Sequence, residues 1–340
     1  MWQQYTYRAA TGSLPYFVYT PEHYQVGTPV PLFVLLHGCT QTAADFAAAT
    51  RMNQLAEIHN FIVVYPQQVS RYNHASCWNW FLPANQVRAS GEPAAIAGIV
   101  QAVREESARW TIDADRIYVA GFSAGGSMAV ILGATYPDIF AAIAVHSGVE
   151  YQAASNVFNA MKAMRQGGPD PSEQGQAAYR AMGNVARVVP VIVFQGLSDE
   201  TVVPLNGNQV VQQWLQTDAL ASNGTYVADF AYPTSVTAGR VPGGHSYVRA
   251  TWNASNGMSV QEYWQISGMG HAWSGGVAST SYTDPSGPDA SLAIYLFFMA
   301  HPRSRRFAAV SAETAAQAHR SFLHTLANFL RTRREKQKHE

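Results

Sequence analysis

The sequence predicts an α/β fold in which a mostly parallel central sheet carries helices on both faces. Short, continuously apolar runs such as residues 31–36 (PLFVLL) and 61–65 (FIVVY) have the length and composition of strands that are buried on both sides. Stretches with apolar residues at helical spacing alternate with these runs, as in consecutive βαβ units. The 340 residues suffice for one large domain.

Each element follows from its local pattern. Residues 92–110 place Ile96, Ile99, Val100 and Val103 on one helical face, and residues 260–266 alternate as a strand should. The expected strands are 14–19, 31–36, 61–65, 116–120, 140–145, 190–195 and 260–266. The expected helices are 43–59, 92–110, 127–135, 208–220 and 289–301. Residues 67–91, 150–189 and 234–257 interrupt the alternation, so we expect long loops there, with a helical start in the second.

The charge balance divides the chain into two parts. Lys plus Arg and Asp plus Glu both number 22, so no overall field attracts nucleic acid. Residues 301–340, however, hold nine basic and three acidic side chains. We therefore expect one domain over residues 1–300, which is long enough for an enzyme domain, and a basic helical C-terminal extension over 301–340. Its apolar stripe (Phe322, Leu323, Leu326, Leu330) packs against the body, against a second subunit in a homodimer, or against nothing stable.

Hydropathy and the first residues bear on location. No run is apolar for long enough to span a bilayer. Residues 1–10 lack the basic start and apolar core of a secretion signal, so the protein either stays in the cytoplasm or has lost such a signal.

Ser123 is the candidate nucleophile. It lies in Gly121-Phe-Ser-Ala-Gly125, a G-x-S-x-G pattern between an expected strand and an expected helix. Such a strand-to-helix turn holds the serine in a strained conformation, and a side chain at either glycine would collide with neighbouring backbone. The helix N-terminus also favours negative charge at the serine.

A serine needs a base, and the base needs a carboxylate to orient it. Asp199 follows the buried strand 190–195, with Glu200 as a rival. His271 lies in a Gly-rich turn after the last strand, whereas His245 lies in a loop between predicted strands. We therefore predict the order Ser123, Asp199, His271 that this fold type uses.

The tetrahedral intermediate of acyl transfer needs backbone N–H donors. Ala124, directly after the nucleophile, is expected to supply one donor. The second is expected from the loop after strand 31–36, where Cys39 is the first choice and Thr40 the alternative. His37 and His146 each follow a buried strand, so we expect them in the floor of the site rather than as bases.

Several longer phrases resemble one family. They are LLHGCTQ (35–41), CWNWF (77–81), GEP (91–93), AGFSAGG (120–126), YPDIFAA (136–142), HSG (146–148), GHAWSGG (270–276) and SYTDPSGPDAS (281–291). In this order they are similar to the poly(3-hydroxybutyrate) depolymerase-like esterases, relatives of the feruloyl and acetylxylan esterases of carbohydrate esterase family 1. The resemblance covers about residues 7–300, and the basic tail lies beyond it.

The resemblance implies an α/β-hydrolase fold and a serine esterase that needs no cofactor and no metal. It places the nucleophile on Ser123, the acid on Asp199, the base on His271 and the oxyanion donors on Cys39 and Ala124. It also suggests a disulfide between Cys39 and Cys77, the alternative being two free buried thiols. An oxidised pair would favour an extracellular or periplasmic location.

The expected substrate is an ester, possibly polymeric. Short-chain polyhydroxyalkanoate or its oligomers come first; feruloyl, acetylxylan or aromatic polyester substrates are the alternative, and an acyltransferase on the same scaffold is a third reading. Trp78, Trp80 and Trp273 are candidates for an apolar binding groove beside Thr40, or else they belong to the core.

Overall fold

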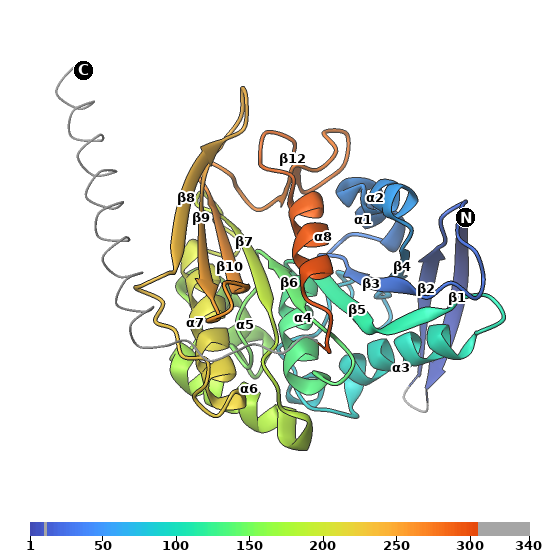
Figure 1. Ribbon diagram of the computed structural model, residues 1–340, viewed down its shortest axis with the longest axis horizontal. Helices are drawn as coiled ribbons and strands as arrows, with labels where there is room; N and C mark the ends of the chain where they lie inside the picture. The colour runs from blue at the N-terminus through green and yellow to red at the C-terminus, as the bar shows by residue number, and fades with distance from the viewer. Residues whose placement is uncertain (10–11, 305–340) are drawn as a thin grey trace.

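The computed structural model describes residues 1–9 and 12–304. Within these residues, ten strands form one sheet in the order β1-β2-β4-β3-β5-β6-β7-β10-β9-β8. The six strands from β4 to β10 pair in parallel, and antiparallel pairs flank them on both sides. Figure 1 shows the sheet running through the molecule with helices on either side. The predicted fold class is confirmed.

The strands and helices have the following bounds. The strands are β1 (Trp2–Ala9), β2 (Gly12–Tyr19), β3 (Val30–Leu36), β4 (Ile62–Pro66), β5 (Ile112–Phe122), β6 (Ile143–His146), β7 (Val191–Gly196), β8 (Ser235–Arg240), β9 (Ser246–Asn253), β10 (Ser259–Ile266), β11 (Trp273–Ser274) and β12 (Thr283–Asp284). The helices are α1 (Ala43–Thr50), α2 (Met52–His59), α3 (Gly91–Glu105), α4 (Ala124–Thr135), α5 (Val157–Gln166), α6 (Pro171–Met182), α7 (Pro204–Ala221) and α8 (Ala290–Ala300).

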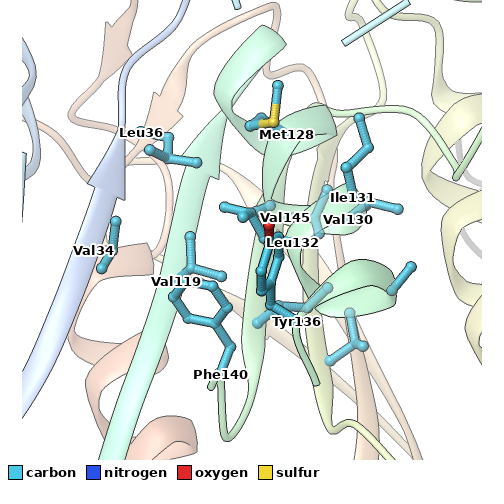
Figure 2. Close-up of a cluster of buried hydrophobic side chains, with 14 of the residues drawn as sticks. Val34, Leu36, Val119, Met128, Val130, Ile131, Leu132, Tyr136, Phe140 and Val145 are labelled. Atoms are coloured by element: carbon cyan, nitrogen blue, oxygen red, sulfur yellow. The ribbon is translucent and has the colours of Figure 1, made fainter. Parts of the chain in front are cut away.

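Two apolar cores lie on opposite faces of the sheet. β3 contributes to both, because its side chains alternate: Leu32, Val34 and Leu36 join one cluster and Phe33 and Leu35 the other. The first cluster includes α3, α4 and α7, and Figure 2 shows its part between β3, β5 and α4. The second cluster lies under α1, α2 and α8. Burial on both faces explains the uninterrupted apolar runs of the central strands.

Several local details differ from the expectations. The stretch 43–59 forms two helices, because Arg51 between them adopts a left-handed conformation with φ 55°. The expected loop 234–257 contains the hairpin of β8 and β9 at the sheet edge. Its sequence carries no strand signal, because four of the six residues of β8 are exposed and none is buried. In residues 150–189 the expected helical start is α5, but the stretch after it carries a second helix, α6, that was not expected. Strand β1 was not expected either.

The C-terminal expectations fall largely outside the described residues. The chain is described as far as Ser304, where Arg303 forms an ion pair with Asp115 at 3.2 Å and so contacts the body. The basic extension, its apolar stripe and the homodimer inferred from it lie in residues 305–340, beyond the part that the structure describes.

Candidate active site

Ser123 occupies a sharp turn between β5 and α4, with φ 56° and ψ −119°. The two flanking glycines permit this turn. A Cβ at Gly121 would lie 2.1 Å from the carbonyl oxygen of Gly125, and a Cβ at Gly125 would lie 2.1 Å from that of Leu36. Both contacts are with backbone, which cannot move aside. The strained serine is therefore held at the carboxyl edge of the parallel strands, where ligands bind in sheets of this type.

His271 joins Ser123 to Asp199. Its Nε2 lies 2.9 Å from Ser123 Oγ, and its Nδ1 lies 2.7 Å from Asp199 Oδ2. With the proton on Nδ1, the ring donates to the carboxylate and its Nε2 accepts from the serine hydroxyl. The ring also packs on Phe122, with 4.8 Å between centroids. These three side chains come from distant parts of the chain and form one hydrogen-bonded series, which we call the relay.

The carboxylate of Asp199 is fixed from both sides. Its Oδ1 accepts the backbone N–H groups of Thr201 and Val202, at 2.9 and 2.8 Å. Its side chain is fully buried, whereas the neighbouring Glu200 is exposed and has no part in the relay. His245 lies elsewhere, with its Nε2 2.8 Å from Asp284 Oδ2.

Cys39 and Ala124 line the same pocket as Ser123. In the described part of the chain, neither N–H is bonded to a protein acceptor. The N–H of Thr40, by contrast, donates to the carbonyl oxygen of Ala75 at 2.7 Å. The N–H of Thr40 is therefore unavailable as the alternative donor. Its hydroxyl donates to the carbonyl oxygen of Cys39 at 2.6 Å and lies 3.3 Å from the hydroxyl of Tyr282.

Cys39 and Cys77 form a disulfide. This confirms the pairing that the family resemblance suggested. The bridge ties the loop after β3 to the irregular segment 67–91, and Cys39 itself borders the pocket.

His37 and His146 lie fully buried below the site. Burial lowers the pKa of His37 to about 4 and that of His146 to about 3, so both rings are neutral near pH 7. His37 Nε2 accepts the N–H of Gln68 at 3.1 Å, and His146 Nε2 accepts that of Ser274 at 3.0 Å. They orient the loops that carry Cys39 and His271, as expected of floor residues.

The pocket around Ser123 has a volume of about 290 Å³. Of the three expected tryptophans, Trp80 lines it. The expectation for Trp78 and Trp273 was wrong, because both are fully buried in the core. Trp273 stacks on His146 with 5.0 Å between ring centroids, and Trp78 lies against His37 at 5.6 Å. These two tryptophans support the floor and do not line the pocket.

Sequence reasoning missed most of the remaining pocket wall. Its other members are Phe122, Ser127, Val149, Met164, Thr201, Val202 and Tyr282. Thr201 and Val202 directly follow Asp199, so their proximity to the triad could have been inferred. Met164 could not, because it lies on α5 and reaches the pocket only through the packing of that helix. Tyr282 lies in one of the recognised phrases but had no assigned role.

The described residues lack two kinds of feature. No group of three or more His, Cys, Asp or Glu side chains there is arranged to hold a metal ion. Nor does that part of the chain contain a helix with the length and apolar character needed to cross a membrane.

Known proteins share both the sequence pattern and the fold. The family model described as "Esterase PHB depolymerase" matches residues 14–229. A "Poly(3-hydroxyalkanoate) depolymerase C" of Paucimonas lemoignei is 35% identical over 264 residues, covering 76% of this chain and 58% of that protein. A "Feruloyl esterase B" of Neurospora crassa is 31% identical over 205 residues, covering 58% and 68% respectively. This chain thus spans less than two thirds of the depolymerase it matches.

One solved structure has a closely similar fold. It is an acetyl xylan esterase from Aspergillus awamori, with a TM-score of 0.69 at 22% identity. The similarity covers 88% of this chain and 99% of that one.

Proposed function

This chain belongs to the esterase PHB depolymerase family, and from that premise we propose that it is a serine esterase that works through an acyl-enzyme. The observation that carries the proposal is the relay of Asp199, His271 and Ser123 at the edge of one pocket. The relay supplies a nucleophile, a base and an orienting carboxylate within hydrogen-bonding distance.

In this mechanism His271 Nε2 takes the hydroxyl proton as Ser123 Oγ attacks the ester carbonyl carbon. Asp199 stabilises the imidazolium that forms, and His271 then protonates the departing alcohol. A water molecule, deprotonated by the same nitrogen, attacks the acyl-enzyme and releases the acid. Every proton moves through one ring, which Asp199 holds in orientation.

Two backbone donors stabilise the developing oxyanion in this proposal. Cys39 and Ala124 line the pocket of the nucleophile, and the N–H of neither has a protein acceptor among the described residues. Ala124 also begins α4, so the positive end of the helix dipole adds to the stabilisation. Donors that are already in place cost no reorganisation when the charge appears.

We propose short-chain polyhydroxyalkanoate esters or their oligomers as the substrate class. The name of the 35% identical relative supports this choice. A volume of about 290 Å³ suits a small acyl unit, and Trp80, Val149, Met164 and Val202 give the wall an apolar character. Because polymer chains consist of such units, an oligomer end could enter the same pocket.

Plant cell-wall esters are the second candidate. Relatives named feruloyl esterase and acetylxylan esterase support it, at 31% and 29% identity. Trp80 at the pocket wall could stack on an aromatic acyl group as well as contact an aliphatic one.

A hydrolysis panel separates the two candidates. Purified protein is tested on p-nitrophenyl butyrate, 3-hydroxybutyrate trimer, amorphous poly(3-hydroxybutyrate), methyl ferulate and acetylated xylan. We expect turnover of the trimer and the polymer to exceed that of ferulate and xylan, and Ser123→Ala to abolish all of it. Ferulate or xylan turnover alone would overturn the polyester assignment, and Ser123→Ala activity within tenfold of wild type would overturn the nucleophile.

The disulfide also supports a proposed location. Disulfides persist in oxidising compartments and are rare in the cytosol. We therefore place the protein in the extracellular space or periplasm, and mass analysis with and without reductant on protein taken directly from each cell fraction tests this placement.

A further inference from the structure

Glu92 is an acidic residue near the site that the proposed chemistry does not use. It lies in the first turn of α3, and its carboxylate accepts three hydrogen bonds. Oε2 accepts the backbone N–H of Asn79 at 2.7 Å. Oε1 accepts the side-chain amides of Asn79 and Gln68, at 2.6 and 2.5 Å. One carboxylate therefore holds two separate parts of the segment 67–91.

The orientation of both amides is fixed by their other partners. Gln68 Oε1 accepts the N–H of Val69 at 3.1 Å, so its amide nitrogen must face Glu92. Asn79 Oδ1 accepts the side-chain amide of Asn73 at 2.8 Å, with the same consequence. Glu92 thus faces donors only, and the ionised carboxylate is the form that satisfies all of them. The N-terminus of α3 favours the same charge. Burial raises the pKa of Glu92 to about 7, while the hydrogen bonds from Asn79 and Gln68 act to lower it.

One of these donors, Gln68, is connected to the loop of Cys39 in two ways. The amide of Gln68 that contacts Glu92 also donates to the carbonyl oxygen of Cys77 at 3.2 Å. Cys77 forms the disulfide with Cys39. The backbone N–H of Gln68 donates to His37, whose Nδ1 contacts the carbonyl oxygen of Gly38 at 2.7 Å. The loop with Cys39 is therefore held from two sides, and both supports pass through Gln68.

Gly91 and Asn85 complete the arrangement. Gly91 has φ 58°, and a Cβ there would lie 1.9 Å from Asn85 Oδ1. That oxygen accepts the N–H of Glu92 at 2.9 Å, and the amide of Asn85 donates to the carbonyl oxygen of Asn79 at 2.9 Å. The backbone on either side of the carboxylate is thus locked to the segment that the carboxylate holds.

We propose that Glu92 is a positioning residue for ester hydrolysis, which sets the Cys39 N–H at the distance that the oxyanion requires. The inference rests on the proposed function, because it assigns the carboxylate a role through the donor proposed there. Glu92 contacts neither the substrate nor the triad. Its effect passes through Gln68 and the disulfide to the backbone of Cys39.

The test is Glu92→Gln in the full chain. The amide nitrogen of the substituted side chain would face the fixed donors of Asn79 and Gln68. The segment 67–91 and the Cys39 loop should therefore shift. A misplacement of about 1 Å at a reacting group costs up to about 100-fold in rate. We expect kcat for p-nitrophenyl butyrate, per active site titrated with a fluorophosphonate, to fall about 10- to 100-fold while KM changes less than threefold. The inhibition constant of a butyl boronic acid, whose adduct carries an oxyanion-like oxygen, should rise by a similar factor.

Glu262→Gln is the matched control. Glu262 is a buried carboxylate on β10 that also faces donors only, Arg249 at 2.8 Å and Trp264 Nε1 at 2.6 Å. It should lower the melting temperature and leave kcat per titrated site and boronate inhibition unchanged.

The outcomes separate the two proposals. If Glu92→Gln lowers only the melting temperature or the titratable fraction, its role is structural and the inference fails while the esterase assignment stands. If wild type shows no hydrolysis dependent on Ser123, the proposed function itself fails.

Discussion

Asp199 Oδ2 lies 2.7 Å from His271 Nδ1, in a side chain that is fully buried, while Glu200 beside it is exposed. Of these two neighbouring acids, only the buried one is hydrogen-bonded to the histidine. The backbone N–H groups of Thr201 and Val202 select Asp199 by fixing its Oδ1.

Asp199→Asn should lower kcat/KM by about four orders of magnitude. The two backbone donors would retain the amide oxygen, which leaves the amide nitrogen facing His271. The imidazole must then carry its proton on Nε2, where it cannot accept the proton of Ser123. Steady-state kinetics on p-nitrophenyl butyrate checks this, with Glu200→Gln expected within twofold of wild type. A loss below tenfold for Asp199→Asn would move the orienting role to another group.

Removing the disulfide should reduce both stability and rate. Cys39 and Cys77 are 38 residues apart, and the loop-entropy estimate for such a bridge is roughly 4 kcal/mol of unfolding free energy. We expect Cys39→Ala/Cys77→Ala to lose a comparable amount in urea unfolding, with a lower kcat because Cys39 borders the nucleophile. Reductant should mimic the effect on wild type and leave the double variant unchanged. Identical unfolding curves for wild type with and without reductant would contradict the prediction.

Trp80 and Trp273 should behave differently when replaced. Trp80 lines the pocket, so Trp80→Ala should change the ratio of kcat/KM for butyrate over acetate esters. Trp273 is fully buried against His146, so Trp273→Ala should cost about 3–5 kcal/mol of unfolding free energy. Urea unfolding and an ester series measure both effects. If Trp273→Ala changed the ester preference without loss of stability, Trp273 would have to line the substrate groove, and the prediction would be wrong.

Glu150 should make stability fall as the pH rises. Both of its carboxylate oxygens are buried with no hydrogen-bond partner among the described residues. Burial, with a smaller contribution from Asp170, raises the pKa of Glu150 to about 8 from an ordinary value of 4.5. The folded state therefore keeps a proton that the unfolded chain releases, and this contribution is complete below pH 4.5 and lost as the pH rises through 8.

Glu150→Gln removes that titration. The difference in unfolding free energy, variant minus wild type, should increase by about 2–4 kcal/mol as the pH rises from 5 to 9. Urea unfolding across this range measures the difference, and the exposed Glu173→Gln is the control with no such trend. A pH-independent difference between Glu150→Gln and wild type would show that Glu150 does not titrate there.

The parallel sheet and the relay were predictable because their signals are local. A strand buried on both faces must be apolar throughout, as β3 and β7 are. Gly121 and Gly125 predict the turn at Ser123, because the backbone contacts at both positions exclude any side chain. The chain order of Ser123, Asp199 and His271 then left few assignments open.

The hairpin of β8 and β9 and the break at Arg51 carried no such local signal. An edge strand exposed to water needs no apolar alternation, because pairing with its neighbour stabilises it. The break at Arg51 depends on a single left-handed residue that is not a glycine.

What the sequence by itself determined was the sheet, the strained serine and its partners, since sterics and periodicity act over a few residues. The tertiary structure alone decided which tryptophan lines the pocket, that Met164 of α5 lines it too, and that Glu92 accepts hydrogen bonds from Gln68 and Asn79. These depend on how elements far apart in the chain pack, and side-chain type does not encode that packing: Trp78 and Trp80 are two residues apart, yet one supports the core and the other lines the site.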